Sequence, residues 1–157
     1  MKSQGGSVEQ TAKVQTQGVT QWATFQLDQE KYGVNVLQVQ EIIRMTEITP
    51  VPGAPGYVLG VINLRGNVVP IISTRERFNL PAAEPTPETR IILVDLEKQV
   101  VGIVVDSVAE VVNLEAGEIE KAPSMDKDEW VQFIHGVARR QSDLLILLDL
   151  SKLLSED

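Results

Sequence analysis

The chain has 157 residues, which fits one compact domain or two very small ones sharing a core and excludes a large multidomain enzyme. Its 14 basic and 22 acidic side chains give a net charge of −8, which repels nucleic acid and anionic membrane surfaces. No cysteine is present, so disulfides, thiol nucleophiles and thiolate metal sites are excluded. Hydrophobic residues make up 43% of the chain and aromatic residues only 4%, so we expect a core of Val, Ile and Leu, which favours strands.

Two polar segments divide the chain. Residues 1–21 are rich in Gln, Thr, Ser and Gly, which predicts a disordered tail, and they contain no apolar run typical of a signal sequence. Residues 81–89 contain three prolines, which predicts a linker between a first half (residues 22–80) and a second half (residues 90–155). No later run reaches membrane-spanning length, so we expect a cytoplasmic protein that does not insert into a membrane.

The first half begins with the pattern of a hairpin. Residues 24–27 and 32–36 alternate polar and apolar side chains on either side of a turn at residues 28–31. Residues 41–45 predict a third strand, and a proline-stiffened loop follows at residues 49–56.

The clearest hairpin in the chain joins residues 61–65 to residues 68–72. Gly66-Asn67 lies between them, and this pair readily adopts the positive φ angles of a two-residue turn. A short helix is expected over residues 74–78, with Thr74 as its N-cap.

The second half repeats this order of elements. We expect strands over residues 91–94, 100–105 and around 111–112, and a short closing helix over residues 149–154. A shift of 76 residues places Gly60-Val61 on Gly136-Val137, and a shift of 69 residues places Gly33-Val34 on Gly102-Ile103. The alternative is that two hairpins rich in Val and Ile look alike by chance.

Each half therefore offers about five short strands. Because open strand edges invite aggregation, the sequence predicts a mainly β fold in which each half curls into a small barrel. We expect the two barrels to pack together over a shared apolar seam, with a groove along their junction and a short helix closing each.

Groups that could support catalysis are few. His135 is the only histidine, and the chain has no Gly-x-Ser-x-Gly elbow, so we interpret His135 as structural. Residues 126–129, Asp-Lys-Asp-Glu, lack the spacing of a calcium loop and fit a helix start capped by Ser124 better than a metal site. The glycines of residues 60–66 bracket a strand and do not form a phosphate-binding loop. We therefore expect no catalytic residue, no metal and no cofactor.

Arg65 has two interpretations that the pattern leaves open. It is a permanent charge beside a tight turn and between apolar strand residues. It serves either as solvated protection of a strand edge or as an interface residue that makes a bidentate contact with a carboxylate of a partner protein.

The motifs of the chain resemble the CheW family of chemotaxis coupling proteins. The resemblance rests on Tyr32-Gly33-Val34-Asn35-Val36, on Gly60-Val61-Ile62-Asn63-Leu64-Arg65-Gly66 followed by Val68-Val69-Pro70-Ile71, and on Val101-Gly102-Ile103-Val104-Val105-Asp106. It extends from about Thr24 to Leu154. One departure is Ser73-Thr74, where the family usually has an acidic residue and a leucine.

The resemblance implies two five-stranded SH3-like barrels and two protein partners. These partners are the cytoplasmic hairpin tip of a chemoreceptor and the regulatory domain of the histidine kinase CheA. It also implies recruitment to membrane-associated receptor arrays. The positions that match partner-binding positions of the family are Val36, Val39, Glu41, Ile42, Asn63, Leu64, Arg65 and Gly66, with Val108 and Glu110 as their counterparts in the second half.

The sequence therefore predicts a non-catalytic adaptor that couples chemoreceptors to CheA. One alternative is the same coupling role in another chemosensory-like pathway. A second alternative, of another class, is a small metal- or nucleotide-dependent enzyme that uses Asp106, Asp126, Asp128 and His135.

Overall fold

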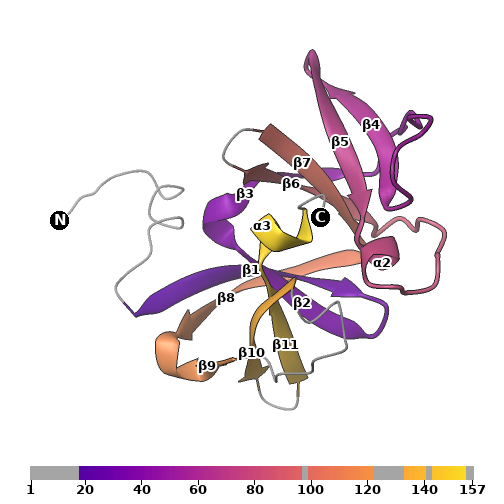
Figure 1. The fold of residues 1–157 in the computed structure, drawn as a ribbon. Coiled ribbons are helices and arrows are strands. Elements are labelled where there is room, and N and C mark those ends of the chain that lie inside the picture. Colours follow the sequence, from indigo (N-terminus) through magenta and orange to yellow (C-terminus); the bar gives the residue numbers. More distant parts are fainter. Residues whose placement is uncertain (1–17, 97–98, 122–132, 141–142, 155–157) are drawn as a thin grey trace.

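The computed structural model describes residues 18–96, 99–121, 133–140 and 143–154. Within these residues, eleven strands form two sheets, and the fold is mainly β as predicted. Sheet A has the strand order β8-β1-β2-β11-β10-β9, and sheet B has the order β3-β6-β7-β5-β4. In Figure 1 the two sheets face each other, with the short helix α3 between them.

The bounds of the elements are as follows. Sheet A contains β1 (Val19–Leu27), β2 (Glu30–Asn35), β8 (Ser107–Glu115), β9 (Ile119–Glu120), β10 (Ile134–Arg140) and β11 (Asp143–Leu148). Sheet B contains β3 (Val39–Arg44), β4 (Val58–Leu64), β5 (Asn67–Ser73), β6 (Arg90–Leu96) and β7 (Gln99–Val105). The helices are the 3₁₀ turns η1 (Val36–Gln38) and η2 (Ala116–Glu118) and the single turns α2 (Thr74–Arg77) and α3 (Leu150–Leu153).

Three apolar clusters give the molecule two barrel interiors and a seam. One cluster lies within sheet A and includes Trp22, Leu114 and Leu147. A second lies within sheet B, and all five strands of that sheet contribute to it or pack against it. The third and largest contains residues of both sheets, such as Phe25 of β1 and Ile103 of β7, and it buries the shared seam that the sequence predicts.

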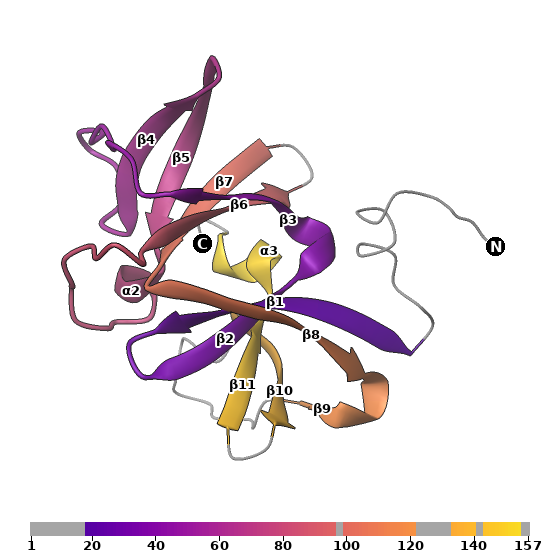
Figure 2. The same cartoon turned by 180° about the vertical axis from the view of Figure 1, so that it is seen from behind.

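The predicted boundary at residues 81–89 does not separate the two barrels. Sheet A combines β1 and β2 from the first half with β8 to β11 from the second, while sheet B combines β3 to β5 with β6 and β7. Figure 2 shows β8 running beside β1, although their paired residues, such as Gln26 and Ser107, lie far apart in the chain. The prediction was wrong because the sequence of a hairpin indicates only how its own two strands pair. Which other strand lies beside the hairpin depends on packing between residues far apart in the chain.

The two halves are nevertheless repeats of one unit, and we call residues 19–77 the first repeat and residues 90–153 the second. The parallel pair Ile71 with Gly102 in sheet B corresponds, after the two shifts, to the parallel pair Leu147 with Gly33 in sheet A. The isolated bridge between Thr49 and Val61 likewise corresponds to the pairing of Glu120 with Val137, which belongs to β9 and β10. The sequence similarity therefore reflects equivalent structure and not a chance likeness of hairpins.

Several local predictions need correction. Val19–Gln21 belong to β1, so the predicted tail is too long by these residues, and residues 1–17 lie outside the described part. Sheet A has six strands where five were expected, because the two-residue strand β9 adds to it. The helix predicted after Ser124 lies outside the described residues.

The short helix α2 is capped by Ser73, one residue before the predicted cap. The Ser73 side chain accepts a hydrogen bond from the Glu76 amide, whereas the Thr74 hydroxyl is buried and donates to the Val104 carbonyl at 2.6 Å. Asp149 caps α3 at the equivalent position of the second repeat. Both repeats therefore end in one capped helical turn, as the sequence predicts.

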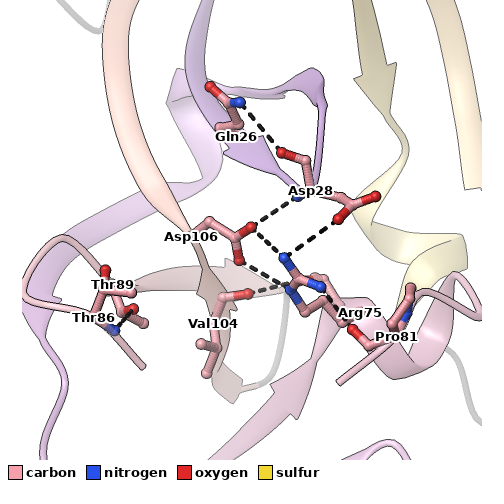
Figure 3. A network of polar contacts seen from close by, with 9 residues as sticks. Gln26, Asp28, Arg75, Pro81, Thr86, Thr89, Val104 and Asp106 are labelled. Atoms are coloured by element: carbon pink, nitrogen blue, oxygen red, sulfur yellow. Dashed lines mark hydrogen bonds and ion pairs between the residues drawn. The ribbon is translucent and has the colours of Figure 1, made fainter. Parts of the chain in front are cut away.

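A polar clasp joins the two sheets where β7 continues into β8 (Figure 3). Arg75 of α2 donates to both carboxylate oxygens of Asp106, with Nε–Oδ1 at 3.1 Å and Nη2–Oδ2 at 2.6 Å. The Asp28 amide, in the β1–β2 turn, donates to Asp106 Oδ2 at 2.8 Å. Because Arg75 follows sheet B and Asp28 belongs to the first hairpin of sheet A, the clasp fixes the relative position of the sheets.

The clasp also holds Asp106 in its charged form. Partial burial disfavours the carboxylate, but the hydrogen bonds from Arg75 and from the Asp28 amide outweigh it, so the pKa of Asp106 lies below its ordinary value. A carboxyl whose pKa is lower in the folded than in the unfolded chain stabilises the fold above its unfolded pKa, and this contribution is lost as the pH falls through the folded pKa.

We predict that Asp106→Asn lowers the free energy of unfolding by about 1–2 kcal/mol at pH 7, because charge-assisted hydrogen bonds at a partly exposed site are lost. Urea denaturation from pH 7 to pH 3 measures the difference from the parent chain, which should shrink below about pH 4. The exposed Glu84→Gln, with the same change of charge, serves as the control and should show a smaller difference. A gap that does not vary with pH would contradict the role of the charged clasp.

Glycine leaves room for neighbouring side chains where the two repeats pair in parallel. A Cβ at Gly102 would lie 2.6 Å from Ile71 Cδ1 and 2.8 Å from Ile91 Cγ2, and one at Gly33 would lie 3.2 Å from Leu147 Cδ2. We predict that Gly102→Ala destabilises the fold by about 1–3 kcal/mol through overpacking and that Gly33→Ala has a smaller effect. Gly117→Ala is the control, because a Cβ there has no neighbour within 4 Å. Thermal denaturation that ranks Gly117→Ala equal to Gly102→Ala would refute this explanation.

Candidate functional site

The β4–β5 hairpin places a charged residue at its tip. Leu64 pairs with Asn67, so the two-residue turn consists of Arg65 and Gly66, one position earlier than the sequence predicts. Both residues have positive φ, 51° and 88°, as a tight hairpin turn of this type requires. The Asn63 side chain accepts a hydrogen bond from the Gly66 amide at 2.9 Å and holds the turn closed. Arg65 therefore adopts a left-handed conformation that is uncommon for a residue with a long side chain.

Arg65 forms an ion pair within the chain. Its Nη2 lies 2.7 Å from Glu41 Oε1, and its Nη1 lies 3.5 Å from Glu41 Oε2, so the guanidinium faces the carboxylate of β3 with two nitrogens. The hydrogen bond and the charge of Glu41 raise the pKa of Arg65. The Arg65 side chain remains 66% exposed and that of Glu41 35% exposed, so the pair contributes little to stability. This bidentate contact lies within the chain, so it decides between neither of the two interpretations of Arg65.

The ion pair lies at an opening of sheet B that we call the sheet B mouth. It is a pocket of about 490 Å³ between the β4–β5 hairpin, β3 and the start of β7. Its lining residues are Gln40, Leu64, Arg65, Asn67, Val68, Val69, Pro70, Gln99 and Val100. Val68 lines this pocket, is 71% exposed and is not among the residues predicted for the site. Its pairing with Asn63, an exposed residue, is the signal that places Val68 on the outer face.

A second pocket lies between the barrels, and we call it the junction groove. It has a volume of about 780 Å³. It is lined by Gln38, Asp95, Leu96, Gln99 and Val101, and by Ser151 and Leu154 from the end of the chain. Gln99 lines both pockets, and Gln38 and Gln40 lie two residues apart on η1 and β3. The two pockets are therefore neighbours on one surface, and the groove predicted from the sequence has a counterpart in the structure.

The structure divides the predicted site residues into two groups. Asn63, Leu64, Arg65, Gly66 and Glu41 lie together at or beside the sheet B mouth. Val36, Val39 and Val108 are half-buried and pack against the seam between the sheets.

Ile42 and Glu110 belong to neither group. Ile42 lies on edge strand β3 and is 40% exposed. Glu110 lies exposed on β8 of sheet A, and its carbonyl accepts a hydrogen bond from the Thr24 hydroxyl. Because Glu110 and Glu41 occupy equivalent positions of the two repeats, Glu110 marks the corresponding end of sheet A.

Of the residues named for an enzyme, the structure describes Asp106 and His135. Asp106 is held in the clasp with Arg75, whereas His135 is exposed on β10 with its ring 5.5 Å from that of Trp22. Asp126 and Asp128 lie outside the described residues. Within residues 18–96, 99–121, 133–140 and 143–154, no group of three or more acidic or histidine side chains is placed to hold a metal ion. In the same part of the chain, no helix is long and apolar enough to cross a membrane.

Comparisons with known proteins agree with this geometry. A family model described as a CheW-like domain matches residues 21–157. A chemotaxis protein CheW from Rhizobium meliloti is 37% identical over 88% of this chain and 90% of its own length. Another, from Treponema pallidum, is 35% identical over 86% of this chain and 82% of its own length.

A solved structure extends the likeness to three dimensions. The crystal structure of the scaffolding protein TtCheW from Thermoanaerobacter tengcongensis superposes with a TM-score of 0.81 and 30% sequence identity. The match covers 88% of this chain and 89% of that chain. Fold, motifs and extent of the match together show that the chain belongs to the CheW-like family.

Proposed function

We propose that this chain is a non-catalytic scaffold of chemotaxis signalling that couples chemoreceptors to the histidine kinase CheA. The observation that carries the proposal is the surface formed by the sheet B mouth and the junction groove. It combines the exposed Val68, an exposed bidentate ion pair and two open pockets. Such a surface offers apolar area and charged groups to a protein partner.

The receptor tip is the partner that this surface fits. A helical hairpin presents an apolar stripe with charged residues beside it, which complements a groove that combines apolar and polar side chains, as the junction groove does. The junction groove accepts the stripe, and Arg65 and Glu41 at its neighbouring mouth fix the register through charge. Both members of the ion pair are exposed enough to exchange their mutual contact for contacts with a partner.

The kinase regulatory domain takes the equivalent end of sheet A. Glu110 and Leu144 lie at this end, in the positions equivalent to Glu41 and Val68 of sheet B. Both Glu110 and Leu144 are exposed. At this end of sheet A, Lys31 pairs with Leu145. The position equivalent to Lys31 in sheet B is Val100, which lines the sheet B mouth. Because equivalent positions hold different side chains, the two ends form two different faces, and a scaffold with two faces brings two partners together.

We predict that Arg65→Gly weakens binding of a soluble receptor-tip fragment by roughly thirtyfold, the effect of losing a central interface arginine. Glycine adopts the positive φ of this position without strain, so the variant should unfold at the same temperature as the parent chain or higher. Isothermal titration calorimetry measures the binding.

The matched control for Arg65 is Arg139→Gly. Arg139 is also exposed and also paired with a glutamate, Glu120, but it lies on sheet A. The control should leave receptor binding unchanged. Equal effects of the two substitutions, or none at Arg65, would contradict the placement of the receptor on the sheet B mouth.

The second face generates the reciprocal prediction. We expect Leu144→Glu to weaken binding of the CheA regulatory domain by roughly tenfold or more, because a charge replaces an exposed apolar contact. Receptor binding should stay within about twofold of the parent chain, since distant sites act independently.

The kinase captured from the native cell by the tagged parent chain gives a separate check of the pathway. Capture of CheA supports the proposal, whereas capture of a kinase of another chemosensory-like system would assign the same scaffold to that pathway.

The outcome that contradicts the Leu144→Glu prediction is loss of receptor binding with kinase binding intact. That outcome would reverse the assignment of the two faces.

A further inference from the structure

The two repeats are tied together by strand pairing and not only by packing. The pairs β1–β2, β4–β5, β6–β7, β9–β10 and β10–β11 join strands of one repeat. The pairs β1–β8, β2–β11, β3–β6 and β5–β7 join the first repeat to the second. Each repeat by itself therefore contributes hairpins to two sheets and completes neither.

The contacts between the repeats follow one pattern that occurs twice. Val39 pairs with Val94 across β3 and β6, and Val108 pairs with Phe25 across β8 and β1, with a register shift directly beside each pair. The two parallel pairings at Gly33 and Gly102 are equivalent in the same way. Each repeat therefore pairs its strands with those of the other repeat, as the two subunits of a strand-exchanged dimer do. The contacts that the first repeat makes with the second are nearly the same as those that the second makes with the first.

One covalent connection joins the repeats. Residues 81–88 are exposed, contain no strand, and make few hydrogen bonds with the rest of the chain, such as the one from Arg75 Nη1 to the Pro81 carbonyl. Rerouting this segment would expose little apolar surface. The clasp between Arg75 and Asp106 and the stacking of Arg77 on Tyr57 and Phe133 join the two repeats without involving it.

We propose that two copies of this chain form a strand-exchanged dimer, in which the first repeat of each copy pairs with the second repeat of the other. Every strand pair, both barrel interiors and the seam are reproduced in this dimer, and only the course of residues 81–89 changes. At low concentration the single chain closes on itself, because a short linker holds the repeats at an effective concentration in the millimolar range. Exchange between folded chains is slow, since both sheets must open first.

The dimer has a consequence for coupling, and this consequence rests on the function proposed above. It contains two sheet B mouths and two corresponding ends of sheet A, because each is rebuilt from repeats of two chains. A scaffold with doubled faces binds arrayed partners with higher avidity than the closed single chain.

Disulfide trapping distinguishes exchange from surface association, and the absence of cysteine from the chain makes it clean. Gln21 of β1 pairs with Asn113 of β8, and their side chains are 3.0 Å apart, so cysteines at these positions are within bonding reach. One full-length chain has Gln21→Cys and another has Asn113→Cys. The two are unfolded in urea together, refolded at roughly 1 mM, near the effective concentration of a short linker, and oxidised.

We expect a covalent heterodimer with the strand content of the parent chain by circular dichroism, in an amount that falls when refolding is done at a thousandfold lower concentration, on the order of 1 µM. Deletion of residues 82–85 should increase it, because a shorter linker opposes closure of the single chain. The double variant Gln21→Cys with Asn113→Cys must form its intramolecular disulfide, which verifies that the pair tolerates the bond.

Two results would overturn the proposal. One is the absence of the covalent heterodimer when the double variant closes its own disulfide. The other is formation of a heterodimer in equal amount when the folded chains are mixed without unfolding, or when Asn67→Cys, at the tip of the β4–β5 hairpin, replaces Asn113→Cys. A heterodimer formed in either of these last two ways would indicate random contact between surfaces and not exchange of strands.

Discussion

The pairing of strands across the two repeats is the constraint on which the remaining features depend. At Gly33 and Gly102 a parallel strand from the other repeat approaches so closely that a side chain is not accommodated without movement. These two contacts join a hairpin of one repeat to a hairpin of the other within each sheet, so each repeat contributes one hairpin to sheet A and another to sheet B. The seam then forms between the sheets, and the clasp of Arg75, Asp106 and Asp28 secures the point where the chain crosses from sheet B to sheet A. Mutual dependence of this kind makes the two barrels one cooperative unit.

The same internal symmetry provides two similar ends that have diverged in chemistry. Sheet B has Glu41 paired with Arg65 beside the exposed Val68, whereas the equivalent end of sheet A has Glu110 and Leu144. Glu110 and Leu144 occupy the positions equivalent to Glu41 and Val68, so the two ends present different side chains to a partner. A duplicated fold with unlike ends is suited to joining two different proteins, and this is the physical basis of the proposed scaffold role.

The sequence predicted what depends on local pattern. Hairpins, the closing helical turns and the repeat follow from alternation, turn residues and self-similarity, and all of them are present. The turn at Arg65-Gly66 was placed one residue late, because Gly-Asn is a good turn sequence and the strand pairing of Leu64 with Asn67 is not visible locally. Exchange of strands between the barrels was missed for a related reason. A strand rich in Val and Ile fits either partner strand, and the choice depends on packing between residues far apart in the chain, such as Gly102 and Ile71. The predicted site residues near Arg65 are adjacent in the fold, but the half-buried position of Val36, Val39 and Val108 at the seam required the structure.

The most direct test of the account is to map both partners on the chain by nuclear magnetic resonance. Backbone amide shifts would be recorded for the full chain on titration with a receptor-tip fragment and, separately, with the CheA regulatory domain. The account predicts that the receptor fragment perturbs residues 38–41, 64–68 and 99–101, and that the kinase domain perturbs the end of sheet A around Glu110 and Leu144. Perturbation of one and the same end by both partners would contradict the central claim that the two repeats present two distinct faces.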